Sequence, residues 1–237
     1  LSFIKQGLMH DLLTGQVRVP SELGAIATGN TASNTPRSER KTNIYFMRSV
    51  LAAEIVGQMH EHATFGHVKF QKTLFLCERM ADLDLETRYH RAAAGPHDNR
   101  LMRSVDGQME KQKWFRKVPR AVAADGKPVG WAYERMEKAG GHREWFEKYW
   151  TPARERIQRV IDLLRPLDTK RCEVVATLYS AWEDLLAAGR EATDDAIVNE
   201  VLTNWHESKQ AIPRDTWVRA LGWMRKQELQ PATIETR

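Results

Sequence analysis

The chain has 237 residues, of which 42% are hydrophobic and 28% are charged. This composition supports a hydrophobic core without the help of disulfides or metal ions. The formal net charge of +5 at pH 7 permits contact with nucleic acid without requiring it. The length predicts one compact domain with an appendage, or two small domains.

The cysteines and the length of the apolar segments indicate where in the cell the protein is located. Cys77 and Cys172 both lie in apolar stretches with helical periodicity, which predicts two buried thiols in a reducing cytoplasm rather than a disulfide. No apolar run reaches the roughly 18 residues of a membrane span, and the N-terminus has no signal-peptide pattern. We therefore expect a cytoplasmic protein without membrane contact. Because the first residue is Leu1 and not Met, we also expect the chain to be part of a longer protein.

The first 41 residues contain one predicted helix and a linker. In residues 1–20, apolar residues recur at helical spacing up to Thr14-Gly15, which predicts a terminal amphipathic helix. Residues 21–41 are rich in Ser, Thr, Asn, Gly and Ala and show no periodicity, so we interpret them as a linker. A domain boundary is therefore predicted near residue 41.

Residues 42–166 are predicted to form a helical domain with one small β-hairpin. Helices are expected over 42–59, 68–83, 99–114 and 151–164, with Thr42-Asn43 as the first cap. A short extended piece at 87–93 leads into the break at Gly95-Pro96. Residues 115–122 and 129–133 flank Asp125-Gly126, a dipeptide typical of hairpin turns.

Residues 167–237 are predicted to form a three-helix bundle, with helices over 171–188, 193–206 and 213–226. These lengths resemble a helix-turn-helix or winged-helix unit, in which the last helix would read DNA. That helix contains Arg214, Arg219, Arg225 and Lys226 around a core stripe of Trp217, Leu221 and Met224. Bundles that contact only protein show the same pattern, and the neighbouring acidic residues would repel phosphate. The predicted fold class is therefore mainly α, with a small hairpin and a C-terminal three-helix bundle that resembles a winged helix.

One segment concentrates the positive charge. Between residues 100 and 120 there are seven Lys or Arg residues against Asp106 and Glu110, so this segment alone carries +5. Such a segment, with Trp114 nearby, could follow a phosphate backbone, or it could be a solvated charged face. The candidate DNA-binding residues are Arg100, Arg103, Lys111, Lys113, Arg116 and Lys117.

The sequence contains little that indicates catalysis. Neither GxxxxGK[ST] nor GxGxxG is present, which argues against a nucleotide-binding core. His60-Glu61-His62, with His67 nearby, is typical of a solvated helix end, and Cys77 of a buried inert thiol. Asp194-Asp195 stands where a helix dipole favours carboxylates. We predict no catalytic residue, no metal ligand and no cofactor, with an unrecognised hydrolase as the remaining alternative.

Residues 4–19, IKQGLMHDLLTGQVRV, resemble the closing stretch of the specificity subunits of type I restriction–modification enzymes. The resemblance implies that this helix pairs with a second conserved helix, separates two DNA-recognition domains and docks modification subunits. The modification and restriction subunits would then be partners. Neither recognition domain is present in this chain, so base-specific reading is not expected.

Residues 44–140 resemble the Panacea or SocA-like antitoxin-associated domain. The resemblance rests on residues 69–78, KFQKTLFLCE, and on residues 93–98, AAGPHD, although His97-Asp98-Asn99 replaces the usual proline-containing continuation. It implies a helical module that binds a protein. The tentative partner-binding residues are Lys69, Lys72, Phe75, Gly95 and Pro96.

These observations favour a non-catalytic accessory domain that follows a specificity subunit and binds a protein partner. A sequence-neutral DNA-binding module is the main alternative, and a toxin-neutralising, antitoxin-like domain is another.

Overall fold

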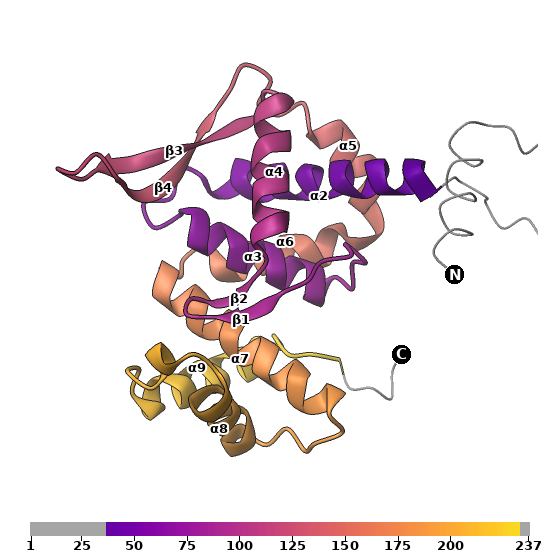
Figure 1. Ribbon diagram of the computed structural model, residues 1–237. Coiled ribbons are helices and arrows are strands. Elements are labelled where there is room, and N and C mark those ends of the chain that lie inside the picture. The colour runs from indigo at the N-terminus through magenta and orange to yellow at the C-terminus, as the bar shows by residue number, and fades with distance from the viewer. Residues whose placement is uncertain (1–36, 233–237) are drawn as a thin grey trace, which may run out of the picture. The chain divides into compact units, whose positions relative to one another are not determined.

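The structure is a computed structural model that describes residues 37–232, with side chains described from residue 44 to residue 232 (Figure 1). The predicted helix within residues 1–20 lies outside the described residues, as does most of the predicted linker. The linker's predicted end at residue 41 is too late, because helix α2 (Arg37–Met59) already begins at Arg37. The charged segment before Thr42 has good intrinsic helix propensity, so the helix continues past the predicted Thr42-Asn43 cap toward the N-terminus.

Helix α3 (His67–Met80) is the central element of the fold. It packs against α2, α6 (Arg154–Leu164), α7 (Thr169–Ala187) and strands β2 (Gly95–His97) and β4 (Pro128–Arg135). All residues from Lys69 to Glu78 are buried, so α3 has no solvated face in this segment. Helix α4 (Asn99–Lys111) crosses α2 in Figure 1 and buries its apolar stripe there, and α5 (Arg143–Trp150) packs on α2 as well.

The strands form two separate antiparallel pairs. β3 (Phe115–Val122) pairs with β4 (Pro128–Arg135), which confirms the predicted hairpin around Asp125-Gly126. Gly126 has φ +80°, the left-handed conformation that this turn needs. The second pair, β1 (His90–Ala92) with β2 (Gly95–His97), was not predicted, because strands of three residues are too short to show alternation.

The C-terminal helices α7, α8 (Asp194–Asn204) and α9 (Arg214–Lys226) pack on one another, as predicted. Asp168 caps α7 and Thr193 caps α8 by accepting hydrogen bonds from backbone N–H groups. Between residues 167 and 232 no strand accompanies these helices, so the expected wing is not found there. Residues 36–237 cluster as one compact unit, and the contacts of α7 with α3 and β2 cross the predicted boundary at residue 166.

Shorter segments complete the described part of the chain. Two 3-10 helices, Thr151–Ala153 and Glu207–Lys209, connect α5 to α6 and α8 to α9. Cys77 and Cys172 are free and buried, as predicted. None of the described helices combines the length and the apolar content that a membrane crossing requires.

Candidate functional site

The predicted partner-binding residues lie in the interior. The structure brings three of them together: Lys72 Nζ donates a hydrogen bond to Pro96 O at 2.5 Å, and a Cβ on Gly95 would lie 3.6 Å from Lys72 Cε. Lys69 donates separately to Arg165 O at 2.9 Å, and the Phe75 ring packs 4.8 Å from that of Tyr89. All five predicted residues are buried. A partner could reach them only if α3 and β2 separated, so their role in partner binding stays a prediction.

Lys72 belongs to a buried polar centre that joins α3, β2 and α7. Its side chain is fully buried, and burial lowers the pKa of Lys72 to about 7, against the attraction of Glu173. Lys209 is also fully buried and donates to Glu173 Oε1 at 2.5 Å. Gln71 accepts from Lys72 at 3.2 Å and contacts His97 Nδ1 at 2.9 Å. These contacts hold the elements together, which is a structural role.

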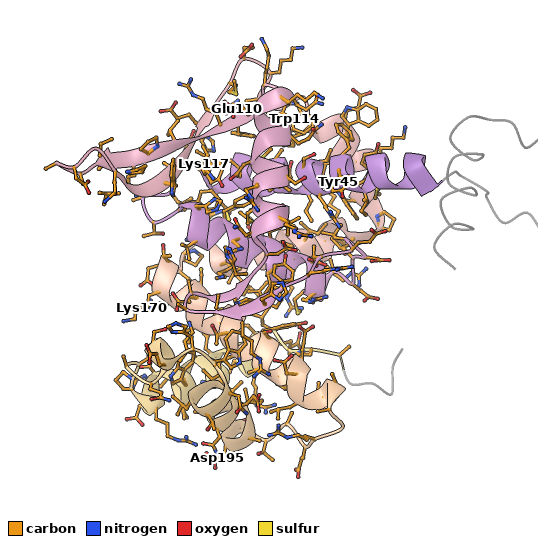
Figure 2. The ribbon with its side chains drawn as sticks, viewed as in Figure 1. Tyr45, Glu110, Trp114, Lys117, Lys170 and Asp195 are labelled. Atoms are coloured by element: carbon orange, nitrogen blue, oxygen red, sulfur yellow. The ribbon has the colours of Figure 1, made fainter. Side chains whose placement is uncertain are left out.

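A second polar network ties α3 and α4 to the hairpin. Tyr133 Oη donates to Asp106 Oδ1 at 2.9 Å and lies 2.7 Å from His67 Nδ1. Lys117 donates to Asp106 Oδ2 at 2.6 Å, between α4 and the hairpin, where Figure 2 labels it. Desolvation lowers the pKa of His67, so its ring is neutral at pH 7. Sequence reasoning counted Asp106 only as a charge in the basic segment and missed this network.

The predicted DNA-binding residues fall into two groups. Three of them are ion-paired: Lys113 with Glu137, Arg116 with Glu134, and Lys117 with Asp106. The other three, Arg100, Arg103 and Lys111, are exposed on α4 and make no ion pair with any described residue. The structure therefore leaves a shorter basic stripe than the sequence suggests, because carboxylates on α4 and around the hairpin neutralise the rest.

The thiols and the histidine-rich helix end offer no reactive site. Burial raises the pKa of the Cys172 thiol to about 12 and raises that of Cys77 further, so neither is a thiolate at neutral pH. His60 Nδ1 contacts Val56 O at the end of α2. Across residues 44–232, no three His, Cys, Asp or Glu side chains are grouped so that they could hold a metal ion.

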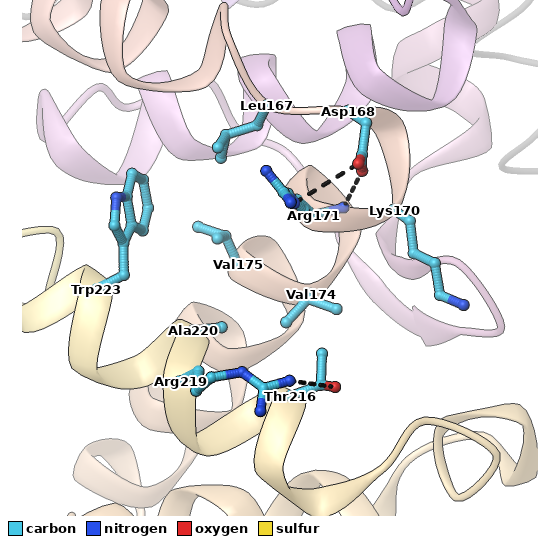
Figure 3. A pocket seen from close by; sticks show the side chains of 10 residues that line it. All are labelled: Leu167, Asp168, Lys170, Arg171, Val174, Val175, Thr216, Arg219, Ala220 and Trp223. Atoms are coloured by element: carbon cyan, nitrogen blue, oxygen red, sulfur yellow. Dashed lines mark hydrogen bonds and ion pairs between the residues drawn. The ribbon is translucent and has the colours of Figure 1, made fainter.

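An open groove with a volume of about 550 Å³ lies between α7 and α9 (Figure 3). Its rim contains Lys170, Arg171 and Arg219, while Asp168 pairs with Arg171. Its floor is apolar and consists of Leu167, Val174, Val175, Ala220 and Trp223. The combination of an apolar floor and a cationic rim is suited to binding an acidic ligand with apolar groups.

Sequence reasoning identified only part of this groove. Trp217, Leu221 and Met224 are buried, as the predicted core stripe requires, and Arg219 was considered only as a DNA-reading residue. Trp223 and Ala220 lie beside that stripe on α9 and were overlooked. The sequence did contain a signal for this surface, because Trp223 is a large apolar residue next to a core stripe that is already complete.

A second hollow of about 440 Å³ adjoins the first at the N-terminus of α7. The two share Asp168, which Figure 3 labels, and Lys170, which Figure 2 labels at that end of α7. Its other side is formed by the hairpin, through Arg120 and Trp131, and by His67 at the start of α3. Arg120 donates to Phe65 O at 2.5 Å, which fixes the hairpin against the loop before α3.

Comparison with models of protein families and with curated proteins finds no match for this chain.

Proposed function

We propose that this chain is the C-terminal part of a type I restriction–modification specificity subunit, and that its helical domain is a non-catalytic accessory domain that binds a protein partner. The resemblance of residues 4–19 supports the assignment to this complex. Modification and restriction subunits as partners, and a cytoplasmic location, belong to the same proposal.

The observation that carries the binding role is the groove between α7 and α9. Its apolar floor includes Trp223, which is only partly buried, and Arg219 on its rim has no carboxylate partner among residues 44–232. Trp223 and Arg219 lie four residues apart on α9, so they share one face of the helix. Aromatic residues and arginine are enriched where proteins bind proteins.

Complex formation tests the proposal. The full chain is mixed with the purified modification subunit of a type I restriction–modification enzyme, and association is measured by analytical ultracentrifugation. We expect a complex that is lost when Leu8→Asp and Leu12→Asp place charges on the apolar positions of the predicted terminal helix. A Gln6→Asp variant adds a charge at a polar position and serves as the matched control. No complex with the unaltered chain, or cleavage or methylation of DNA by the chain alone, would contradict the proposal.

DNA binding is the second candidate function, and the stripe of Arg100, Arg103 and Lys111 favours it. We expect that Arg103→Glu together with Lys111→Glu would weaken binding of a random 30-base-pair duplex, whatever its sequence. The slope of log affinity against log salt should fall by about one for each cation lost. Fluorescence anisotropy of the full chain measures both, with Arg156→Glu, at an exposed position on α6, as a charge reversal elsewhere. Equal affinity in all variants would remove this candidate.

A further inference from the structure

We infer that the groove between α7 and α9 binds an acidic amphipathic segment of a partner protein, with a large apolar side chain on the floor and carboxylates at the rim. This inference rests on the proposed protein-binding function and names the chemistry of the partner.

The cations of the rim distinguish this groove from the rest of α9. Of the three arginines on this helix, Arg214 pairs with Asp195 and Arg225 pairs with Asp194. Arg219 has only a 3.5 Å contact with Thr216 Oγ1 inside the described structure. Lys170, across the groove on α7, is exposed and makes no ion pair with a described residue. The rim therefore carries two cations, Lys170 and Arg219, that no carboxylate among the described residues compensates.

The floor decides which kind of anion fits. Leu167, Ala220 and Trp223 are partly buried against the core and present apolar surface to the groove, while Val174 and Val175 beneath them are almost fully buried (Figure 3). A bare phosphate backbone would gain nothing from this surface. An aliphatic or aromatic side chain would gain about 25 cal/mol for each Å² of apolar surface that it buries. The volume of about 550 Å³ holds one or two large side chains and not a whole helix.

The geometry favours a helical segment of the partner. On a helix, residues three and four positions apart share one face, so an apolar side chain can have carboxylates above and below it. That spacing would place the carboxylates toward Lys170 on one side and Arg219 on the other. The adjoining hollow, with Arg120 and Trp131, extends the surface beyond Lys170 and could receive the next part of the same segment.

The charges of this chain argue against its own segments as the occupant. Residues 1–36 contain Asp11 and Glu22 against Lys5 and Arg18, and residues 233–237 contain one acidic and one basic residue. Neither segment is acidic overall. A second copy of the chain would bring a net charge of +5 toward a cationic rim. A separate acidic protein segment fits better on charge.

Selection from a displayed library of random 16-residue peptides tests the inference with the full chain as bait. We expect the enriched peptides to combine net negative charge with a Trp, Phe or Leu anchor. Synthetic peptides of the enriched sequences are then measured by fluorescence anisotropy. Arg219→Glu should weaken their binding by about tenfold or more, while Arg219→Lys should restore most of it.

Arg103→Glu is the matched control, since it reverses an exposed, unpaired arginine on α4 and should leave peptide affinity unchanged. Trp223→Ala should also weaken peptide binding. Because Arg219 is exposed, the result for Arg219→Glu holds even if the Trp223→Ala variant does not fold. Failure to enrich acidic peptides, or equal affinity for Arg219→Glu, would overturn the inference. So would a 20-nucleotide single-stranded DNA that binds more tightly than the peptides and loses affinity in the same variant.

The two experiments can fail independently. If acidic peptides bind in the groove while the modification subunit does not associate, the assignment to the restriction complex falls and the groove inference stands. If the modification subunit associates while no acidic peptide is enriched, the groove inference falls and the assignment to the restriction complex stands.

Discussion

Two regions of this protein use basic side chains in opposite ways. On α3, Lys69 and Lys72 are fully buried and donate to backbone carbonyls, Lys69 to Arg165 O and Lys72 to Pro96 O on β2. At the groove between α7 and α9, Lys170 and Arg219 lie on an open rim without a carboxylate partner among the described residues. A buried cation must be compensated, so the first region is fixed by folding. An exposed, uncompensated cation beside an apolar floor is free to bind.

Among the substitutions that test this comparison, one at Gly95 should change the free energy of unfolding most. Its φ is +90°, and a Cβ there would lie 2.7 Å from Thr177 Oγ1. Gly95→Ala combines an unfavourable backbone conformation with a steric clash, so we expect a loss of roughly 2–5 kcal/mol in the free energy of unfolding. Urea denaturation measures it. Gly189→Ala is the matched control, since Gly189 has φ +66° and no atom within 4 Å of the added Cβ. Equal losses would show that the contact with Thr177 does not restrict Gly95.

Replacement of Lys209 should cause the next largest loss of stability. Its ammonium group is buried and pairs with Glu173, so Lys209→Met leaves a partly buried carboxylate without its hydrogen-bond donor. We expect a loss of about 2–3 kcal/mol, below the value for a fully buried pair because Glu173 remains partly exposed. Thermal unfolding at pH 7 measures the change. Lys226→Met, at an exposed position on the same bundle, should change stability by less than about 0.5 kcal/mol. An equally small loss for Lys209→Met would contradict the compensated-burial argument.

The same contrast explains what the sequence could and could not predict. The hairpin around Asp125-Gly126 and the helix predicted to start at residue 193 depend on local residues, and both are found in the structure. Residues 69–78 were predicted to bind a partner, but their polar side chains are buried together with the apolar ones, which reflects packing and not an exposed surface. The groove depends on side chains about fifty residues apart, such as Lys170 and Arg219. No local pattern indicates that pairing.

The titration of Lys72 should make a smaller contribution to stability, and this contribution depends on pH. Burial lowers its pKa from the usual 10.5 to about 7, while Glu173 opposes this shift and Lys209 adds to it. Between these values the unfolded chain binds more protons than the folded chain, so the free energy of unfolding rises as the pH rises from 7. Against Lys72→Met, we expect the unaltered protein to gain about 1–2 kcal/mol between pH 7 and pH 9. Urea denaturation at both pH values measures this gain. Parallel pH profiles would show that Lys72 does not titrate in this window.

The smallest effect concerns the hairpin, where exposed cations are paired. Arg116 and Glu134 are 2.9 Å apart and each side chain is about half exposed, at 54% and 51%. Solvent screens such a pair, so Glu134→Gln should change the free energy of unfolding by less than about 1 kcal/mol. The substitution would nevertheless leave the positive charge of Arg116 without a negatively charged partner. If the basic residues of α4 and the hairpin bind DNA, affinity for random duplex DNA should rise by about threefold at low salt and converge at high salt. Anisotropy of the full chain at several salt concentrations measures this, with Glu155→Gln on α6 as the control. An unchanged affinity would leave the uncompensated cations of the groove as the better supported binding surface.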